Sequence, residues 1–156
     1  MLRTLKGMMN KSVDTLLDLY AGVGTFSFGL RDKARRVLSI ESSSSAVLDF
    51  QANCILNETT HLQIRSADVR EVLPYIKDKP NVTVLDPPRS GCPKSVIRWV
   101  GEHTSEAILY VSCDPATLAR DLAHLDELGW QVDTVQPVDL FPQTFHIETL
   151  VKLTRK

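Results

Sequence analysis

Short apolar runs typical of β-strands alternate with helix-like segments along this chain, and the alternation restricts the possible folds more than any other feature. The strand-like runs cover residues 15–20, 36–41, 61–65, 81–86, 107–111, 130–138 and 147–153. The helix-like segments cover residues 25–32, 45–57, 69–76, 94–102 and 116–128. Strands joined through helices pair in parallel, so we expect an α/β fold with a mostly parallel sheet and helices on both faces. The last two strands lack a helix between them and are expected to pair antiparallel at the sheet edge.

The length of 156 residues fits one domain with a single core, preceded by a lead-in segment at about residues 1–12. The formal net charge is −1, so no overall basic excess points to a nucleic-acid partner, although a local basic patch stays open. The sequence has neither an apolar run long enough to span a bilayer nor the apolar core of a signal peptide. We therefore expect no membrane partner and a cytoplasmic location.

The three cysteines, Cys54, Cys92 and Cys113, are far apart and form no Cys-x-x-Cys pair or Cys/His cluster. Zinc and iron–sulfur sites need such spacing, so we expect no metal. A sparse, odd number of cysteines is typical of a reducing compartment, which agrees with the cytoplasmic location.

Cys113 follows an apolar strand and comes just before Pro115, a residue suited to the first turn of a helix. Amide dipoles at a helix N-terminus favour the thiolate, the form of cysteine that attacks carbon electrophiles. Cys113 is therefore a candidate nucleophile. The alternative is a small buried cysteine at the end of a core strand.

Gly22 and Gly24 follow the first strand and allow a tight turn with close backbone approach to a ligand. The dinucleotide fingerprint G-x-G-x-x-G is not met, because Ser27 stands in place of the third glycine. The sequence also lacks the lysine of a nucleotide triphosphatase P-loop.

Acidic residues end the next three strands or directly follow them: Glu41, Asp68 and Asp86. The carboxyl ends of parallel strands meet at one edge, which binds the ligand in such sheets. A carboxylate at Glu41 can accept hydrogen bonds from both ribose hydroxyls, and Asp68 can accept one from an adenine amino group. Each acid taken alone is also compatible with an ordinary loop carboxylate, but together they indicate a nucleoside-binding edge.

Four segments carry a resemblance to a known family: residues 18–26, 86–91, 110–121 and 137–148. They read DLYAGVGTF, DPPRSG, YVSCDPATLARD and PVDLFPQTFHIE. Together they resemble the S-adenosylmethionine-dependent RNA uracil-5-methyltransferases, which make 5-methyluridine in tRNA or rRNA. The resemblance extends from about Val13 onward. It implies a Rossmann-like methyltransferase fold, S-adenosyl-L-methionine as cofactor and RNA as substrate.

The resemblance also implies roles for individual residues. Those implied in binding the cofactor are Tyr20, Gly22, Gly24, Thr25, Glu41, Asp68 and Asp86. Cys113 would be the nucleophile that adds to carbon 6 of uracil, Glu148 the base that removes the carbon 5 proton, and Asp86 would lie between cofactor and target base.

Two residues are candidates for contact with the RNA. Arg89 suits a phosphate or base contact, with a structural ion pair near a helix start as the alternative. Phe145, like Phe141, could stack on a flipped base or pack in the core.

The sequence departs from the family pattern in several places. These 156 residues include no segment like the N-terminal RNA-binding domains of longer family members, so we expect a catalytic domain that needs a further RNA-binding domain or partner. Asp114 replaces a usual Asn, and Cys92 replaces a common leucine and is expected to be a spectator. We expect a monomer.

Two alternative functions stay open. One is a cofactor-binding domain without turnover of its own. The other is an amino-group methyltransferase that uses the Asp86-Pro-Pro motif.

Overall fold

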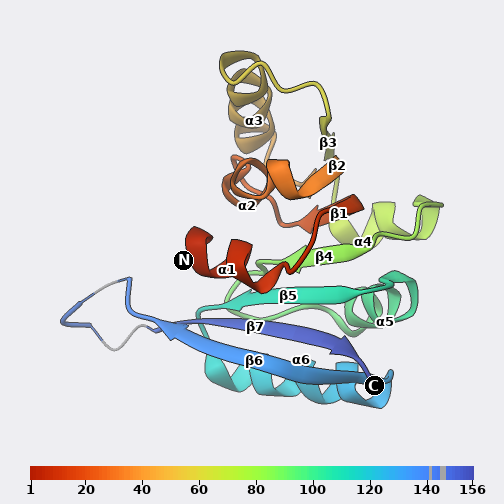
Figure 1. Ribbon diagram of the computed structural model, residues 1–156, viewed down its shortest axis with the longest axis vertical. Helices are drawn as coiled ribbons and strands as arrows, with labels where there is room; N and C mark the ends of the chain where they lie inside the picture. Colours follow the sequence, from red (N-terminus) through yellow and green to blue (C-terminus); the bar gives the residue numbers. More distant parts are fainter. Residues whose placement is uncertain (141, 145–146) are drawn as a thin grey trace.

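The computed structural model describes residues 1–140, 142–144 and 147–156, and its seven strands form one sheet (Figure 1). The strand order is β3-β2-β1-β4-β5-β7-β6. The strands are β1 (Val13–Leu19), β2 (Ala34–Glu41), β3 (Leu62–Ser66), β4 (Val82–Leu85), β5 (Ala107–Ser112), β6 (Trp130–Val138) and β7 (Glu148–Arg155). Phe141 and Phe145, for which the sequence left base stacking and core packing open, lie outside the described residues.

The first five strands pair in parallel, and β7 runs antiparallel to both β5 and β6. The mostly parallel α/β sheet and the antiparallel final pair are both confirmed. Within that pair β7 lies next to β5, and β6 takes the outer edge.

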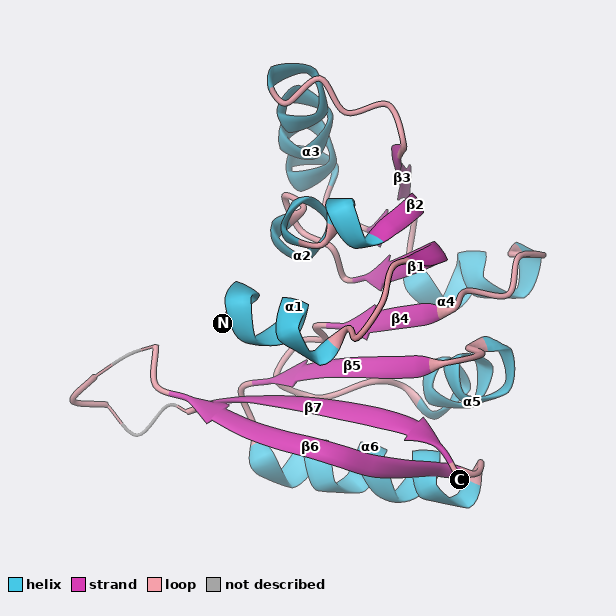
Figure 2. Cartoon of the chain, in the orientation of Figure 1, coloured by secondary structure: helices cyan, strands magenta, loops and turns pink. Residues whose placement is uncertain are grey.

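Helices cover both faces of the sheet, as expected (Figure 2). The helices are α1 (Leu2–Met8), α2 (Thr25–Gly29), α3 (Ser44–Leu56), α4 (Val69–Val72), α5 (Lys94–His103) and α6 (Pro115–Glu127). Side chains of α1, α2 and α3 pack with one set of strand residues, and those of α4, α5 and α6 pack with the alternate set. This alternation follows from the two-residue period of a strand buried on both faces.

Two expected helices are shorter than predicted, and a further helix lies in the lead-in segment. The helix expected over residues 25–32 ends at Gly29 and is followed by a 3-10 turn over Arg31–Lys33. The helix expected over residues 69–76 ends at Val72 and continues as a 3-10 turn over Leu73–Tyr75, because Pro74 has no N–H to continue the α-helical bonds. Helix α1 lies in the expected lead-in segment, where Leu5 and Met8 are buried at a spacing of three residues.

Candidate functional site

The parallel register brings the predicted acidic residues to one edge of the sheet. The ends of β2, β1 and β4 are level, so Glu41, Tyr20 and Asp86 are neighbours across the strands. Glu41 also pairs with Ser66 of β3, two residues before Asp68. The expected common edge is therefore present. Tyr20 lies at this edge with a backbone φ of 63°, in the left-handed region that residues other than glycine rarely adopt.

The antiparallel register of β5 and β7 brings Cys113 and Glu148 to the same edge. Ser112, the last residue of β5, pairs with Thr149 of β7. Cys113 follows Ser112 and Glu148 precedes Thr149, so both lie just beyond the last β5–β7 pair, and Glu148 still pairs with Val138 of β6. Asp86 arrives from β4, the neighbour of β5 on its other side.

Glu41 is oriented by two backbone amides. The Gly22 N–H donates to one carboxylate oxygen at 2.9 Å, and the Ser43 N–H donates to the other at 2.7 Å. Gly22 adopts a left-handed φ of 54°, and a Cβ there would meet nothing within 4 Å. The glycine turn therefore fixes the position of the carboxylate, as well as allowing close approach of a ligand.

Asp68 begins α4 and is held by Arg70. Its carboxylate accepts from the Arg70 amide at 2.8 Å and from the guanidinium at 3.0 and 2.7 Å. These hydrogen bonds hold the pKa of Asp68 below its usual range. An amino group of a ligand at Asp68 would share these oxygens with Arg70, a partner that sequence reasoning did not identify.

A cavity of about 310 Å³ lies at this edge, in the size range of small-ligand sites. Its lining includes the predicted residues Tyr20, Glu41 and Asp68, together with Pro88, Ser90 and Gly91 from the loop after β4. A carboxylate held by two amides in the wall of a cavity can accept hydrogen bonds from the hydroxyl groups of a ligand.

Gly24 and Thr25 are placed differently from the other predicted cofactor residues. Gly24 has a φ of 95°, and a Cβ there would lie 2.7 Å from the rings of Phe28 and Phe50. Its lack of a side chain is therefore required for packing. Thr25 is exposed at the start of α2, and neither residue lines the cavity.

Asp86 and Glu148 interact electrostatically. Burial raises the pKa of Asp86 to about 6, and repulsion from Glu148 adds to the rise. A carboxyl group that titrates near pH 6 can exchange a proton close to neutral pH.

Cys113 is a half-buried free thiol between β5 and α6. The amides that begin α6 are occupied by its neighbour, since the Asp114 carboxylate accepts from Ala116 N–H at 3.0 Å and Thr117 N–H at 2.9 Å. These two N–H groups therefore already bind a capping carboxylate. The prediction that the helix N-terminus stabilises the Cys113 thiolate did not take this cap into account.

Arg89 forms the ion pair that the sequence left as an alternative. Its Nε lies 3.7 Å from the Asp114 carboxylate, and its side chain is 64% exposed. The exposed guanidinium remains accessible to an anionic partner.

Comparison with known proteins places these features in a family. The model of the tRNA (uracil-5-)-methyltransferase family matches residues 1–156. The chain belongs to this family.

Individual relatives agree with the family assignment. An uncharacterised RNA methyltransferase of Thermotoga maritima is 43% identical over 142 residues, which are 91% of this chain and 32% of that protein. One of Clostridium acetobutylicum is 41% identical over 152 residues, 96% of this chain and 33% of that protein. The chain thus spans about a third of the length of the curated relatives it matches.

A solved structure gives the same result. The tRNA (uracil-54, C5)-methyltransferase of Pyrococcus abyssi, in complex with S-adenosyl-L-homocysteine, superposes with a TM-score of 0.86 and 29% identity. The match covers 98% of this chain and 37% of that one. The Rossmann-like methyltransferase fold is confirmed.

In this family member, Asp18 is a buried acid whose role sequence reasoning did not identify. It accepts from Ser27 Oγ at 2.5 Å, and Ser27 lies 2.7 Å from Ser39 Oγ. Its other oxygen has no hydrogen-bond partner among the described residues. Burial raises the pKa of Asp18 to about 7, the Ser27 hydrogen bond opposes this, and Asp86 and Glu41 add to the rise.

The described part of the chain contains no group of three or more His, Cys, Asp or Glu residues that could hold a metal ion. Over the same residues, none of the helices is both long and apolar enough to cross a membrane.

Asp18→Asn is expected to reduce the pH dependence of stability. The folded protein retains the Asp18 proton to higher pH than the unfolded chain. Its contribution to stability is therefore full below about pH 4 and is lost as pH rises through about 7. The fall in unfolding free energy between pH 5 and pH 8 should shrink by roughly 2 kcal/mol in the variant.

Urea denaturation at the two pH values measures this difference. Asp14→Asn, which changes an exposed acid on the same strand, is the matched control and should leave the dependence intact. Equal pH dependence in wild type and Asp18→Asn would contradict the assignment.

Proposed function

We propose that the chain is the catalytic domain of an RNA 5-methyluridine methyltransferase. It would transfer a methyl group from S-adenosylmethionine to carbon 5 of a uridine in tRNA or rRNA. The observation that carries the proposal is the β5–β7 register, in which Cys113 and Glu148 occupy adjoining backbone positions just beyond the Ser112–Thr149 pair. The uracil-5 reaction needs both groups at the same base.

The cofactor would bind at the cavity, with Glu41 accepting from the ribose hydroxyls and Asp68 facing the adenine. Tyr20 and Gly22 would border it, whereas Gly24 and Thr25 would act through the shape of the turn. When bound, S-adenosylmethionine would supply an electrophilic methyl group and leave as S-adenosylhomocysteine.

The proposed chemistry assigns one step to each residue. The Cys113 thiolate forms a bond to carbon 6 of the uracil, which makes carbon 5 nucleophilic enough to take the methyl group. Glu148 then removes the proton from carbon 5, the electron pair restores the carbon 5–carbon 6 double bond, and the sulfur leaves. Asp86 would stand between the cofactor and the base, where its carboxyl group could form hydrogen bonds with polar atoms of the ring.

Arg89 is the proposed RNA contact among the described residues. Its guanidinium is exposed and only loosely paired, so a phosphate or a base edge can compete for it. Phe145 remains the second proposed contact.

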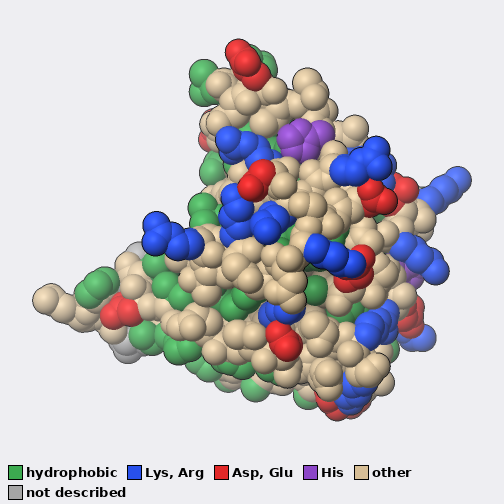
Figure 3. Space-filling model, in the orientation of Figure 1, with side chains coloured by type: hydrophobic (Ala, Val, Ile, Leu, Met, Phe, Trp, Pro, Cys, Tyr) green, Lys and Arg blue, Asp and Glu red, His purple; other side chains and the backbone are tan. Residues whose placement is uncertain are grey.

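The charge of this chain supports a need for further RNA-binding surface. The net charge is −1, and on the face drawn in Figure 3 the basic side chains are scattered among acidic ones. Several basic residues are already paired, such as Lys6 with Asp32 at 2.6 Å and Arg36 with Asp78 at 2.8 Å. RNA affinity depends on Lys and Arg side chains that are free to contact the phosphates of the RNA. We therefore propose that another domain or partner supplies part of this affinity.

Cys113→Ala is expected to abolish formation of 5-methyluridine, because no other group adds to carbon 6. Glu148→Gln should still transfer the methyl group but retain the RNA, because the carbon 5 proton stays in place. Incubation with methyl-labelled cofactor and unmodified tRNA, followed by nucleoside analysis and a denaturing gel, measures both outcomes.

Cys54→Ala removes a half-buried thiol on α3 and is the matched control, with unchanged product expected. Product from Cys113→Ala at the wild-type rate would refute the covalent route. Loss of activity in Asp86→Asn with Cys113→Ala still active would instead support an amino-group methyltransferase. Cofactor binding without transfer to any RNA would support a binding domain.

Glu41→Gln is expected to weaken S-adenosylhomocysteine binding about tenfold, which corresponds to ~1.4 kcal/mol. The amide retains the shape of the side chain but loses the charge that receives two ribose hydroxyls. Isothermal titration calorimetry gives the Kd. Glu71→Gln, at an exposed acid in the first turn of α4, is the control, and equal affinities in both variants would contradict the assignment.

A further inference from the structure

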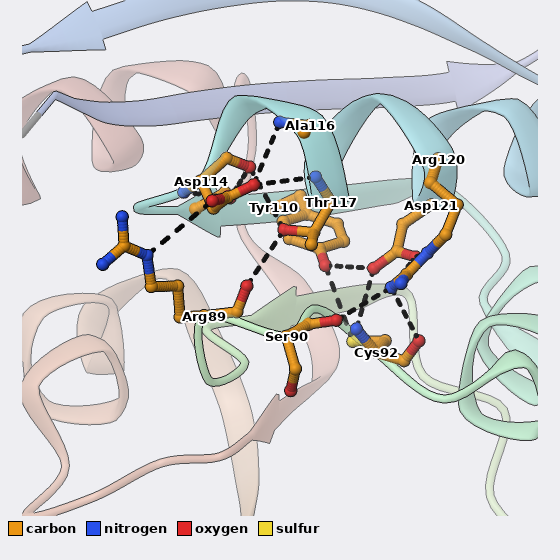
Figure 4. A network of polar contacts seen from close by, with 10 residues as sticks. Arg89, Ser90, Cys92, Tyr110, Asp114, Ala116, Thr117, Arg120 and Asp121 are labelled. Atoms are coloured by element: carbon orange, nitrogen blue, oxygen red, sulfur yellow. Dashed lines mark hydrogen bonds and ion pairs between the residues drawn. The ribbon is translucent and has the colours of Figure 1, made fainter.

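The loop between β4 and α5 is bonded to α6 through one buried carboxylate (Figure 4). Asp121 of α6 is completely buried. It accepts from the Cys92 N–H at 2.8 Å and from the Tyr110 hydroxyl at 2.6 Å. Arg120 donates to its other oxygen at 2.9 and 2.8 Å. All four contacts are hydrogen bonds to a charged group, the stronger class.

Arg120 extends the connection to the backbone of the loop. Its Nη2 donates to the Ser90 carbonyl at 3.0 Å and lies 3.4 Å from the Cys92 carbonyl. Thr117, one helical turn earlier, donates to the Arg89 carbonyl at 3.2 Å. The loop is thus fixed to α6 along its length.

Gly91 shows how closely the two segments approach. It has a left-handed φ of 75°, and a Cβ there would lie 2.5 Å from Arg120 Nη2 and 2.7 Å from Asp121 Oδ2. A side chain at this position would push the loop away from the helix.

The two connected segments carry different parts of the proposed site. The loop starts directly after Asp86, and Ser90 and Gly91 line the cavity proposed for the cofactor. Helix α6 begins two residues after Cys113. The bonds around Asp121 therefore join the cofactor side of the site to the segment that carries the nucleophile.

We propose that Asp121, with Arg120, is a positioning residue for methyl transfer. It fixes the loop that follows Asp86 relative to the segment that carries Cys113. The Cys113 thiol, the Asp86 carboxylate and the cofactor cavity therefore keep constant positions relative to one another. The inference rests on the proposed function. Such an arrangement acts on the rate of the bound complex, because misplacement of reacting groups by about 1 Å costs orders of magnitude in rate.

Arg120→Gln tests the proposal by removing the guanidinium that donates to one Asp121 oxygen, while the other oxygen retains the Cys92 amide and the Tyr110 hydroxyl. Arg98→Gln is the control, because Arg98 forms an exposed ion pair of the same 2.8 Å length with Glu102 on α5. Gly91→Ala is the second variant. It changes the loop and not the helix, and its added methyl group pushes the loop away from α6.

Two rates are measured after thermal unfolding has shown that each variant is folded. The first is the saturating rate of Cys113 adduct formation on 5-fluorouridine RNA in the presence of S-adenosylmethionine, together with the RNA concentration for half-saturation. The second is alkylation of Cys113 by iodoacetamide, followed by mass spectrometry with Cys54 as internal reference.

We expect Arg120→Gln and Gly91→Ala to lower the saturating adduct rate at least tenfold, with the half-saturating RNA concentration changed less than threefold. Arg98→Gln should match wild type. Cys113 alkylation relative to Cys54 should rise at least threefold in the two variants, because the segment is less constrained. Rates equal to those of Arg98→Gln, or a change in half-saturation alone, would overturn the proposal.

Adduct formation by the wild-type protein tests the proposed function separately from the role of Asp121. If wild type forms no adduct, the alkylation comparison still decides the inference. An unchanged Cys113 to Cys54 ratio would overturn it, and a threefold rise confined to the two variants would support it.

Discussion

Parallel pairing of β1 with β2 and β4 is the constraint on which the site depends. Strands that run in one direction end at one edge, so every residue that follows a strand there is brought near the others. Glu41, Tyr20 and Asp86 meet because their strands are level, although they are widely separated in sequence. The short-range contacts, such as the Gly22 amide on Glu41, then fix the orientation of each group.

Antiparallel β7 brings the start of a strand, and not its end, to the edge that carries the site. An antiparallel strand starts at the edge where its neighbours end, so its first residue, Glu148, joins the carboxyl ends of β4 and β5. This explains how a residue near the end of the chain shares an edge with residues from its first half. Repulsion between Glu148 and Asp86 is the electrostatic consequence.

Much of the fold followed from the sequence, because hydrophobic period and turn residues are local signals. The strands of the sheet and the acidic residues at their ends were predictable on that basis. The partner of Asp68 was not, because it is the long side chain of Arg70. The Asp114 cap has a local signal, an aspartate directly before the proline that begins α6, which the sequence reasoning did not use. Asp121 was accessible in principle, since it lies on the apolar stripe of α6 with Leu118 and Leu125, where a charge needs a buried partner.

Mass spectrometry of wild-type protein incubated with S-adenosylmethionine and 5-fluorouridine RNA tests the central claim most directly. Fluorine at carbon 5 cannot leave as a proton, so Glu148 cannot complete the reaction and the sulfur stays attached. The account predicts a stable RNA adduct that maps to the peptide containing Cys113 and carries the transferred methyl group. Methylated RNA without an adduct, or an adduct mapped to Cys54 or Cys92, would contradict it.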